Sequence, residues 1–259
     1  MKYKTKLLAE RFTSVLSQWQ GVECVSLNEA AREDTLDPYF ALILDVFYAG
    51  SIPDAAERCS LFGEDVAAFE TSGRADKDRF LIGGLPVRLE YKSIQQIQTL
   101  VSLVSTSAES LWLIKDSGTY GFYRLTQGEL LFYRTDWIKE IQKQLLTLDS
   151  SFWAQMRYNY QSKMEHLLND LGAAFLQEDD FNYLISSALF VKTACLTLFC
   201  INHRFEPSHR AYYKQTLELP ILPEAFRAQL LTFLRGDPEI THERKYAIAQ
   251  CMARNIVAL

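Results

Sequence analysis

The sequence predicts an α+β fold in which a mixed β-sheet with flanking helices is followed by an all-helical bundle. Two observations carry this prediction. Short runs of β-type residues alternate with helical stretches up to about residue 136, and from Trp137 onward apolar residues recur at three- and four-residue steps. The chain has 259 residues, 48% of them hydrophobic, which is enough for two cores. We therefore expect one domain over residues 1–136 and a second over residues 137–259.

The first half alternates expected strands with expected helices. The strands cover residues 23–27, 41–48, 79–82, 86–91 and 111–115, and the helices cover residues 5–18 and 93–105. Turn residues such as Gly50, Pro53 and Gly83-Gly84 separate these elements. Mixed elements of this length are typical of a small sheet covered by helices.

The second half is expected to be helical throughout. Amphipathic helices are expected from Trp137 onward, and further helices are expected at residues 181–202, 224–235 and 242–258. Pro207, Pro220, Pro223 and Pro238 lie in the connections, where proline does not interrupt a helix. This half is therefore interpreted as a helical bundle.

Composition and charge narrow the classes of function. A net charge of −5 argues against a protein dedicated to nucleic-acid binding, which normally carries a basic domain. No stretch approaches the roughly 20 apolar residues needed to span a bilayer, and the amino-terminal residues do not have the pattern of a signal peptide. Five scattered cysteines fit buried, reduced thiols. We therefore expect a cytoplasmic protein without a membrane segment, and its oligomeric state stays open.

One carboxylate, Asp45, lies among apolar neighbours in the expected strand at residues 41–48. An unpaired acid is costly to bury, so a cation or a hydrogen-bond donor is expected beside it. Asp45 is therefore either a functional residue or an acid that caps a turn or accepts hydrogen bonds from backbone amides.

The layout around Asp45 resembles the nucleotidyltransferase superfamily, specifically its small bacterial members related to lincosamide and kanamycin nucleotidyltransferases. The resemblance rests on the strand VECVSL, the turn Asn28-Glu29, the helix AAREDT and the strands ALILDVFY and PVRLEYK. It implies an α/β catalytic domain followed by a helical bundle. It also implies that Asp45 and Glu90 are catalytic residues that hold Mg²⁺.

Two positions depart from the pattern of that family. Asn28-Glu29 stands where the family has Gly-Ser, and glycine there lets the backbone approach a phosphate. Strand side chains alternate between faces, and Asp45 has no second aspartate two residues away. Two-metal phosphoryl transfer needs several oxygen ligands. Glu29 is a candidate replacement ligand, because magnesium is often held by one or two carboxylates and substrate phosphate.

Cations near the expected cleft are candidates for binding a nucleotide. Arg88 and Lys92 share a strand face with Glu90, so this group is either part of the site or a surface ion-pair ladder. Lys77 and Arg79 either hold a triphosphate or form a solvated cluster in a loop.

In the second half, Lys192 interrupts an apolar helix. Its side chain either snorkels to the surface or points into a cleft and meets a phosphate.

Three functions are compatible with these residues. The first is an enzyme that uses Mg²⁺ to transfer a nucleoside monophosphate from a nucleoside triphosphate to a hydroxyl of a small-molecule acceptor. The second is a catalytically degenerate relative that binds a nucleotide or a protein partner, which the two departures favour. The third is a pure scaffolding protein. Whether the chain is an enzyme stays open, because a fold does not fix a function.

Overall fold

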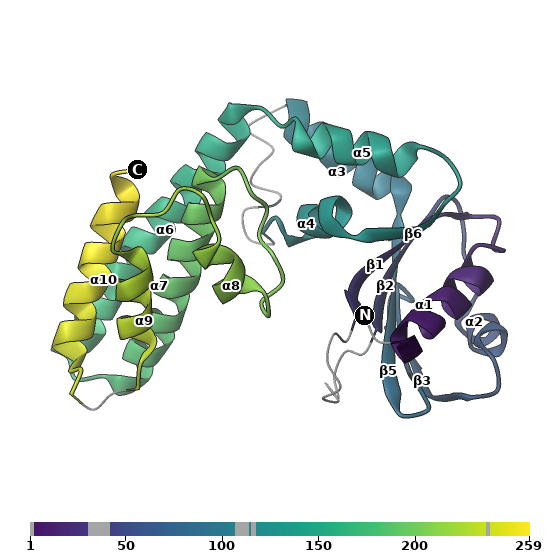
Figure 1. Cartoon of the computed structure of the whole chain (residues 1–259), viewed down its shortest axis with the longest axis horizontal. Coiled ribbons are helices and arrows are strands. Elements are labelled where there is room, and N and C mark those ends of the chain that lie inside the picture. The colour runs from purple at the N-terminus through teal and green to yellow at the C-terminus, as the bar shows by residue number, and fades with distance from the viewer. Residues whose placement is uncertain (1–2, 31–41, 107–113, 115–117, 237–238) are drawn as a thin grey trace. The chain divides into compact units, whose positions relative to one another are not determined.

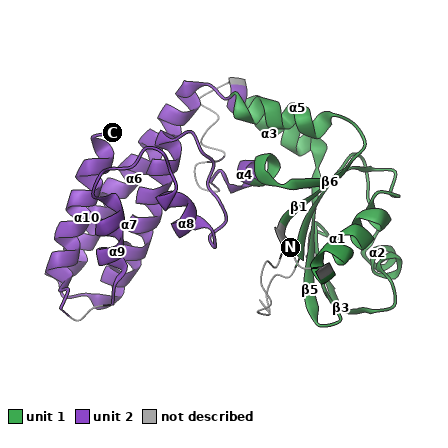
Figure 2. Cartoon of the chain, viewed as in Figure 1, with its two compact units in different colours: residues 1–103, 124–147 green, residues 104–123, 148–259 purple. Residues whose placement is uncertain are grey.

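The computed structural model describes residues 3–30, 42–106, 114, 118–236 and 239–259. Packing divides the chain into two compact units, each described by itself below (Figure 2). Unit 1 comprises residues 1–103 and 124–147, and unit 2 comprises residues 104–123 and 148–259. The expected boundary at residue 136 falls inside unit 1, and helix residues 137–147 belong to the same unit as the sheet.

Unit 1 is built on a six-stranded mixed sheet. Its strands are β1 (Val22–Ala30), β2 (Leu42–Tyr48), β3 (Val66–Thr71), β4 (Lys77–Ile82), β5 (Leu85–Ser93) and β6 (Glu129–Tyr133), in the order β3-β4-β5-β2-β1-β6. Strands β2 and β5 are parallel, and the other neighbours are antiparallel. The α+β prediction is therefore confirmed, and four expected strands match β1, β2, β4 and β5. The strand expected at residues 111–115 and the helix AAREDT lie, except for residues 30 and 114, outside the described residues.

Among the described residues of this part of the chain, the helices are α1 (Tyr3–Leu16), α2 (Ala55–Phe62), α3 (Ile94–Thr106), α4 (Tyr120–Gln127) and α5 (Trp137–Leu146). The last residues of α3 and the first of α4 are assigned to unit 2. Helices α1 and α2 lie on one side of the sheet (Figure 1). Phe12 of α1 and Phe62 of α2 pack there edge to face, with ring centroids 5.6 Å apart, on a core that includes Leu44 and Leu89. Burial of such aromatic and aliphatic side chains is the main contribution to holding these helices on the sheet.

The opposite face of the sheet carries most of the charged strand residues. Strand alternation places Phe80 and Ile82 in the core with α1 and α2, so Lys77 and Arg79 lie on the other face. At one end of this second face, Phe47 packs against Trp137 of α5 with ring centroids 5.7 Å apart. We name this side of the sheet the charged face.

A buried ion pair stabilises the core side of β4. Asp78 accepts hydrogen bonds from Arg58 Nε at 2.7 Å and from the Tyr91 hydroxyl at 2.7 Å, and all three residues are buried. A buried pair of this kind is tolerated because each charged atom meets a partner. The run Lys77-Asp78-Arg79 is therefore strand and not loop, and its central acid is structural.

Unit 2 is helical and contains α6 (Ser150–Leu176), α7 (Asp180–Ile201), α8 (Tyr212–Leu217), α9 (Phe226–Leu234) and α10 (His242–Val257). The expected bundle is confirmed. Asp179 caps α7 by accepting a hydrogen bond from the Asn182 amide, and Thr241 caps α10 through the Arg244 amide. The core includes Leu171, Phe190, Leu198, Phe226 and Met252.

Helix α7 is the one helix of the described chain that is long and apolar enough to cross a membrane by length and composition. Much of the surface of α7 is buried in the core of unit 2, to which Phe190, Ala194 and Leu198 belong. All five cysteines are free thiols, and three of them are buried.

Candidate functional site

The two acids expected to form the site are direct neighbours on the charged face. Asp45 on β2 lies opposite Glu90 in the parallel register with β5, and Glu90 lies opposite Lys77 of β4. On the other side of Asp45, β1 places Ser26 opposite it. Directly opposed residues share a face, so one row of side chains runs from Lys77 through the two acids to Ser26.

An arginine that the sequence analysis did not identify joins the two acids. Arg124, on α4, donates from Nη2 to Asp45 Oδ1 at 2.5 Å and from Nη1 to Glu90 Oε2 at 2.7 Å. The Arg124 side chain is only 7% exposed, and Asp45 is fully buried. The planar guanidinium suits this role because its N–H groups can meet two carboxylates at once.

Further donors meet the remaining oxygens of the two acids. Lys92 Nζ lies 2.8 Å from Asp45 Oδ1, and Asn28 Nδ2 donates to Asp45 Oδ2 at 2.5 Å. Arg88 Nε lies 3.1 Å from Glu90 Oε1. Each of the four carboxylate oxygens therefore faces at least one N–H donor.

The charges around Glu90 set its protonation state. Burial by itself raises the pKa of a carboxyl, but Arg124, Lys92, Arg88 and Lys77 together hold the pKa of Glu90 below its ordinary value. Glu90 is therefore ionised at neutral pH and forms part of an ion-pair network.

This donor set does not fit a magnesium ion. Magnesium needs oxygen ligands with free lone pairs, and here Asp45 Oδ2 accepts from the Asn28 amide while the other three carboxylate oxygens lie beside cations that would repel a dication. The residues that the structure describes contain no group of three or more His, Cys, Asp or Glu side chains able to hold a metal.

The turn predicted at Asn28-Glu29 is wrong. Both residues lie inside β1, which continues to Ala30, and Glu29 pairs with Ile43 across a register shift after Leu27. The sequence suggested a turn because Asn and Glu are poor strand residues. In this strand, the side-chain amide of Asn28 donates a hydrogen bond to the buried carboxylate of Asp45. The side chain of Glu29 lies outside the part of the chain that is described.

The other predicted binding residues divide between the two units. Arg79 lies opposite Arg88 and Glu70 on the charged face, and its side chain is exposed. Lys192 belongs to α7 in unit 2, where its Nζ lies 4.0 Å from Glu206 Oε1. Within unit 1, the structure therefore brings together Asn28, Asp45, Lys77, Arg79, Arg88 and Glu90.

The sequence did not predict a role for Arg124, because no functional motif surrounds it. A single cation between Tyr123 and Leu125 in a short helix is normally interpreted as a solvent-exposed residue. Only the three-dimensional arrangement shows that this side chain is buried.

A second cluster of titratable groups surrounds Glu206 in unit 2. Glu206 is 6% exposed, and it accepts a hydrogen bond from the Tyr212 hydroxyl at 3.2 Å. Burial raises the pKa of Glu206 above its ordinary value, although Lys192, Tyr212 and His209 act in the opposite direction. A cavity of about 200 Å³ lies beside it, which is smaller than the usual range of ligand sites.

Comparison with known proteins places few limits on function. No family model matches the chain, and no curated protein matches it. Among solved structures, a nucleotidyltransferase-like protein from Exiguobacterium sibiricum 255-15 is similar at 12% sequence identity, over 95% of this chain and 72% of that chain, with a TM-score of 0.49. A similarity at this level does not identify a substrate or an activity.

Proposed function

We propose that this chain is a nucleotidyltransferase-like protein that binds the phosphates of a nucleotide directly through cationic side chains, without metal-dependent transfer. The observation that carries the proposal is Arg124, which bridges Asp45 and Glu90 where the resemblance places a magnesium site. With arginine and lysine already on these acids, the charged face is suited to an anion and not to a cation.

The charge balance of the face supports this proposal. The described side chains of the charged face include five cations, namely Lys77, Arg79, Arg88, Lys92 and Arg124. They include three acids, namely Asp45, Glu70 and Glu90. This local excess of positive charge occurs in a chain whose net charge is −5. Arg79 is exposed and makes no ion pair with a described residue, so its guanidinium is available to a phosphate.

The competing proposal is that the protein transfers a nucleoside monophosphate from a nucleoside triphosphate to a hydroxyl of a small-molecule acceptor. It requires Arg124 and Lys92 to leave the acids so that Mg²⁺ can bind. Kinship with the lincosamide and kanamycin enzymes belongs to this second proposal.

Calorimetric titration of the full chain with ATP, GTP, CTP and UTP distinguishes the two proposals. We expect binding in the presence of EDTA, weakened about tenfold or more by the double substitution Lys77→Ala and Arg79→Ala, because each removes a charged hydrogen bond. Lys139→Ala, at an exposed lysine of α5, is the control and should leave binding unchanged.

Two outcomes would contradict direct phosphate binding. Binding only with Mg²⁺, lost in Asp45→Ala and followed by turnover on hydroxylated acceptors, would establish the transfer reaction. Failure to bind any of the four nucleotides would instead favour a protein-interaction module.

A further inference from the structure

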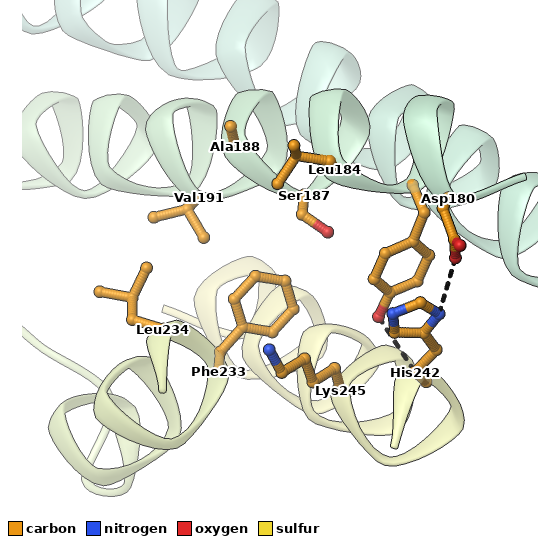
Figure 3. Close-up of a pocket in the computed structure, with 10 residues that line it drawn as sticks. Asp180, Leu184, Ser187, Ala188, Val191, Phe233, Leu234, His242 and Lys245 are labelled. Atoms are coloured by element: carbon orange, nitrogen blue, oxygen red, sulfur yellow. Dashed lines mark hydrogen bonds and ion pairs between the residues drawn. The ribbon is translucent and has the colours of Figure 1, made fainter. Parts of the chain in front are cut away.

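A groove in unit 2 has the dimensions of a ligand site. It lies between α7, α9 and α10, has a volume of about 670 Å³ and is shown in Figure 3. Its apolar walls include Leu184 and Val191 of α7 and Phe233 and Leu234 of α9. This volume falls inside the range of roughly 300–1,000 Å³ typical of small-molecule sites. We name it the α7–α10 groove.

The mouth of the groove exposes apolar surface to water. Leu184 is 69% exposed and Leu234 is 53% exposed, on the two opposing walls. Side chains of this size are normally covered, and their exposure around a concave surface is typical of a binding site. An apolar ligand that lay between them would remove this surface from water.

The groove contains a lysine whose positive charge has no counter-charge within the described residues. Lys245 of α10 is half-buried and makes no ion pair with any residue in the described ranges. Its side chain runs toward Phe233 and away from Asp180 and His242, so the ammonium group ends inside the groove (Figure 3). Ser187 Oγ on α7 is buried beside Tyr183, whose pKa is raised by burial and lowered by the hydrogen bond with Ser187.

The other charged group of the groove, Asp180, is 88% exposed and therefore solvated. Its Oδ1 lies 3.7 Å from His242 Nδ1, a contact that is an ion pair only when the imidazole is protonated, and the backbone carbonyl of His242 accepts a hydrogen bond from the Tyr183 hydroxyl. The imidazole of His242 also stacks on the ring of Tyr183 with centroids 4.1 Å apart. The charge that remains to be met by a ligand is therefore the positive charge of Lys245.

We propose that the α7–α10 groove binds an unbranched aliphatic carboxylate. The carboxylate lies at Lys245 Nζ, and the hydrocarbon chain lies along Leu184, Val191 and Leu234. A carboxylate meets the ammonium group with both an opposite charge and a hydrogen-bond acceptor. An alkyl amine would place like charges together, and an alcohol would leave the ammonium without a counter-charge.

Titration calorimetry with hexanoate, octanoate and decanoate tests the proposal on the full chain. Burial of methylene groups predicts affinity that rises by roughly tenfold for each two carbons added. Decan-1-ol should bind about tenfold more weakly than decanoate, because it lacks the charged hydrogen bond to Lys245. Decylamine should not bind.

Matched variants separate the head group from the chain. Lys245→Met keeps the apolar stem, and it should lower the affinity for decanoate to that for decan-1-ol. Lys214→Met, at an exposed lysine of α8, should change neither affinity. Ala188→Trp fills the groove and should abolish binding of both ligands, whereas Ala173→Trp, on the exposed side of α6, should not.

Three results would overturn the proposal. The first is an absence of binding for all three carboxylates. The second is equal affinity for decanoate and decan-1-ol in the wild-type chain, which would show that Lys245 is not a head-group partner. The third is a dimer that becomes a monomer in Ala188→Trp with no carboxylate bound, which would make the groove a protein interface. Lys245→Met tests the head group even where Ala188→Trp fails to fold.

Discussion

At the scale of single residues, Arg124 determines whether Asp45 and Glu90 behave as an ion-pair network or as a metal site. Both acids share its guanidinium, and Asp45 has no contact with solvent. Removing one partner of a buried ion pair leaves an uncompensated charge, which costs about 3–5 kcal/mol. Active-site residues, in contrast, are commonly replaced with little loss or even a gain of stability.

We therefore expect Arg124→Met and Asp45→Ala each to lower the free energy of unfolding by about 3 kcal/mol, measured by urea denaturation. The two effects should be non-additive in the double variant, because both substitutions break the same contact. Lys139→Met removes an exposed ion pair with Asp136 and serves as the control, without a measurable change expected. Unchanged or increased stability of Asp45→Ala would favour the metal-site interpretation.

At the scale of elements, the link between α4 and β6 holds Arg124 over the sheet. This link contains Gly128, whose amide donates to the carbonyl of Arg124 at 3.0 Å. A Cβ atom on Gly128 would lie 2.8 Å from Arg124 O and 3.1 Å from Ser26 Oγ. The distance to Arg124 O is too short for a real Cβ contact, so a side chain at residue 128 would force the end of α4 to shift, whereas Ser26 Oγ on β1 would have to move by only a few tenths of an ångström.

Gly128→Ala should consequently destabilise unit 1 by about 1–3 kcal/mol, because α4 must shift to relieve the contact. Gly121→Ala, inside α4, is the control, since no heavy atom lies within 4 Å of its added Cβ. That control should be neutral or stabilise α4 by up to about 1 kcal/mol through helix propensity. Chemical denaturation of both variants measures the difference, and equal effects would show that the close approach does not constrain α4.

The helices and strands that could be predicted from the sequence share a clear pattern of apolar residues. The core strands β2 and β5 and the long helices α7 and α10 carry continuous or periodic apolar side chains, and their positions were predicted to within a few residues. Helices α2, α4 and α8 were not predicted because each has no more than eight residues. Their stability depends on contacts with distant parts of the chain, which a local pattern does not contain.

The same distinction applies to the candidate site. The alternation of β5 was sufficient to predict that Glu90 shares a face with Arg88 and Lys92, whereas the position of Asp45 beside Glu90 was an implication of the family resemblance. The bridge from Arg124 connects residues 79 positions apart in the chain, so no spacing rule could reveal it.

At the scale of the whole molecule, each of the two units has a hydrophobic core of its own among the described residues. The core around Phe12 and Phe62 lies wholly in unit 1, and the core around Phe190 and Phe226 lies wholly in unit 2. Chains with two cores commonly unfold in more than one step. We expect two thermal transitions in differential scanning calorimetry, one for each unit.

Acidification should move these two transitions in opposite directions, because Glu90 and Glu206 have pKa values shifted in opposite senses. The pKa of Glu206 is raised in folded unit 2, so the folded state binds more protons than the unfolded state above the ordinary pKa of 4.5. Its unfavourable contribution is therefore relieved as pH falls from neutrality toward 4.5. The pKa of Glu90 is lowered in folded unit 1, so its stabilising contribution is retained above 4.5 and lost as pH falls below that value.

Single substitutions assign each effect to its unit. The melting temperature of unit 2 should rise as the pH falls from neutral to 4.5, and Glu206→Gln should abolish the part of this rise that Glu206 causes. The same substitution should leave the melting temperature of unit 1 unchanged. Glu90→Gln should lower the unit 1 transition at neutral pH, remove part of its fall below pH 4.5, and leave unit 2 unchanged. Because each carboxyl lies within one core-bearing unit, a variant that moves both transitions together would show that the two units unfold as a single cooperative structure.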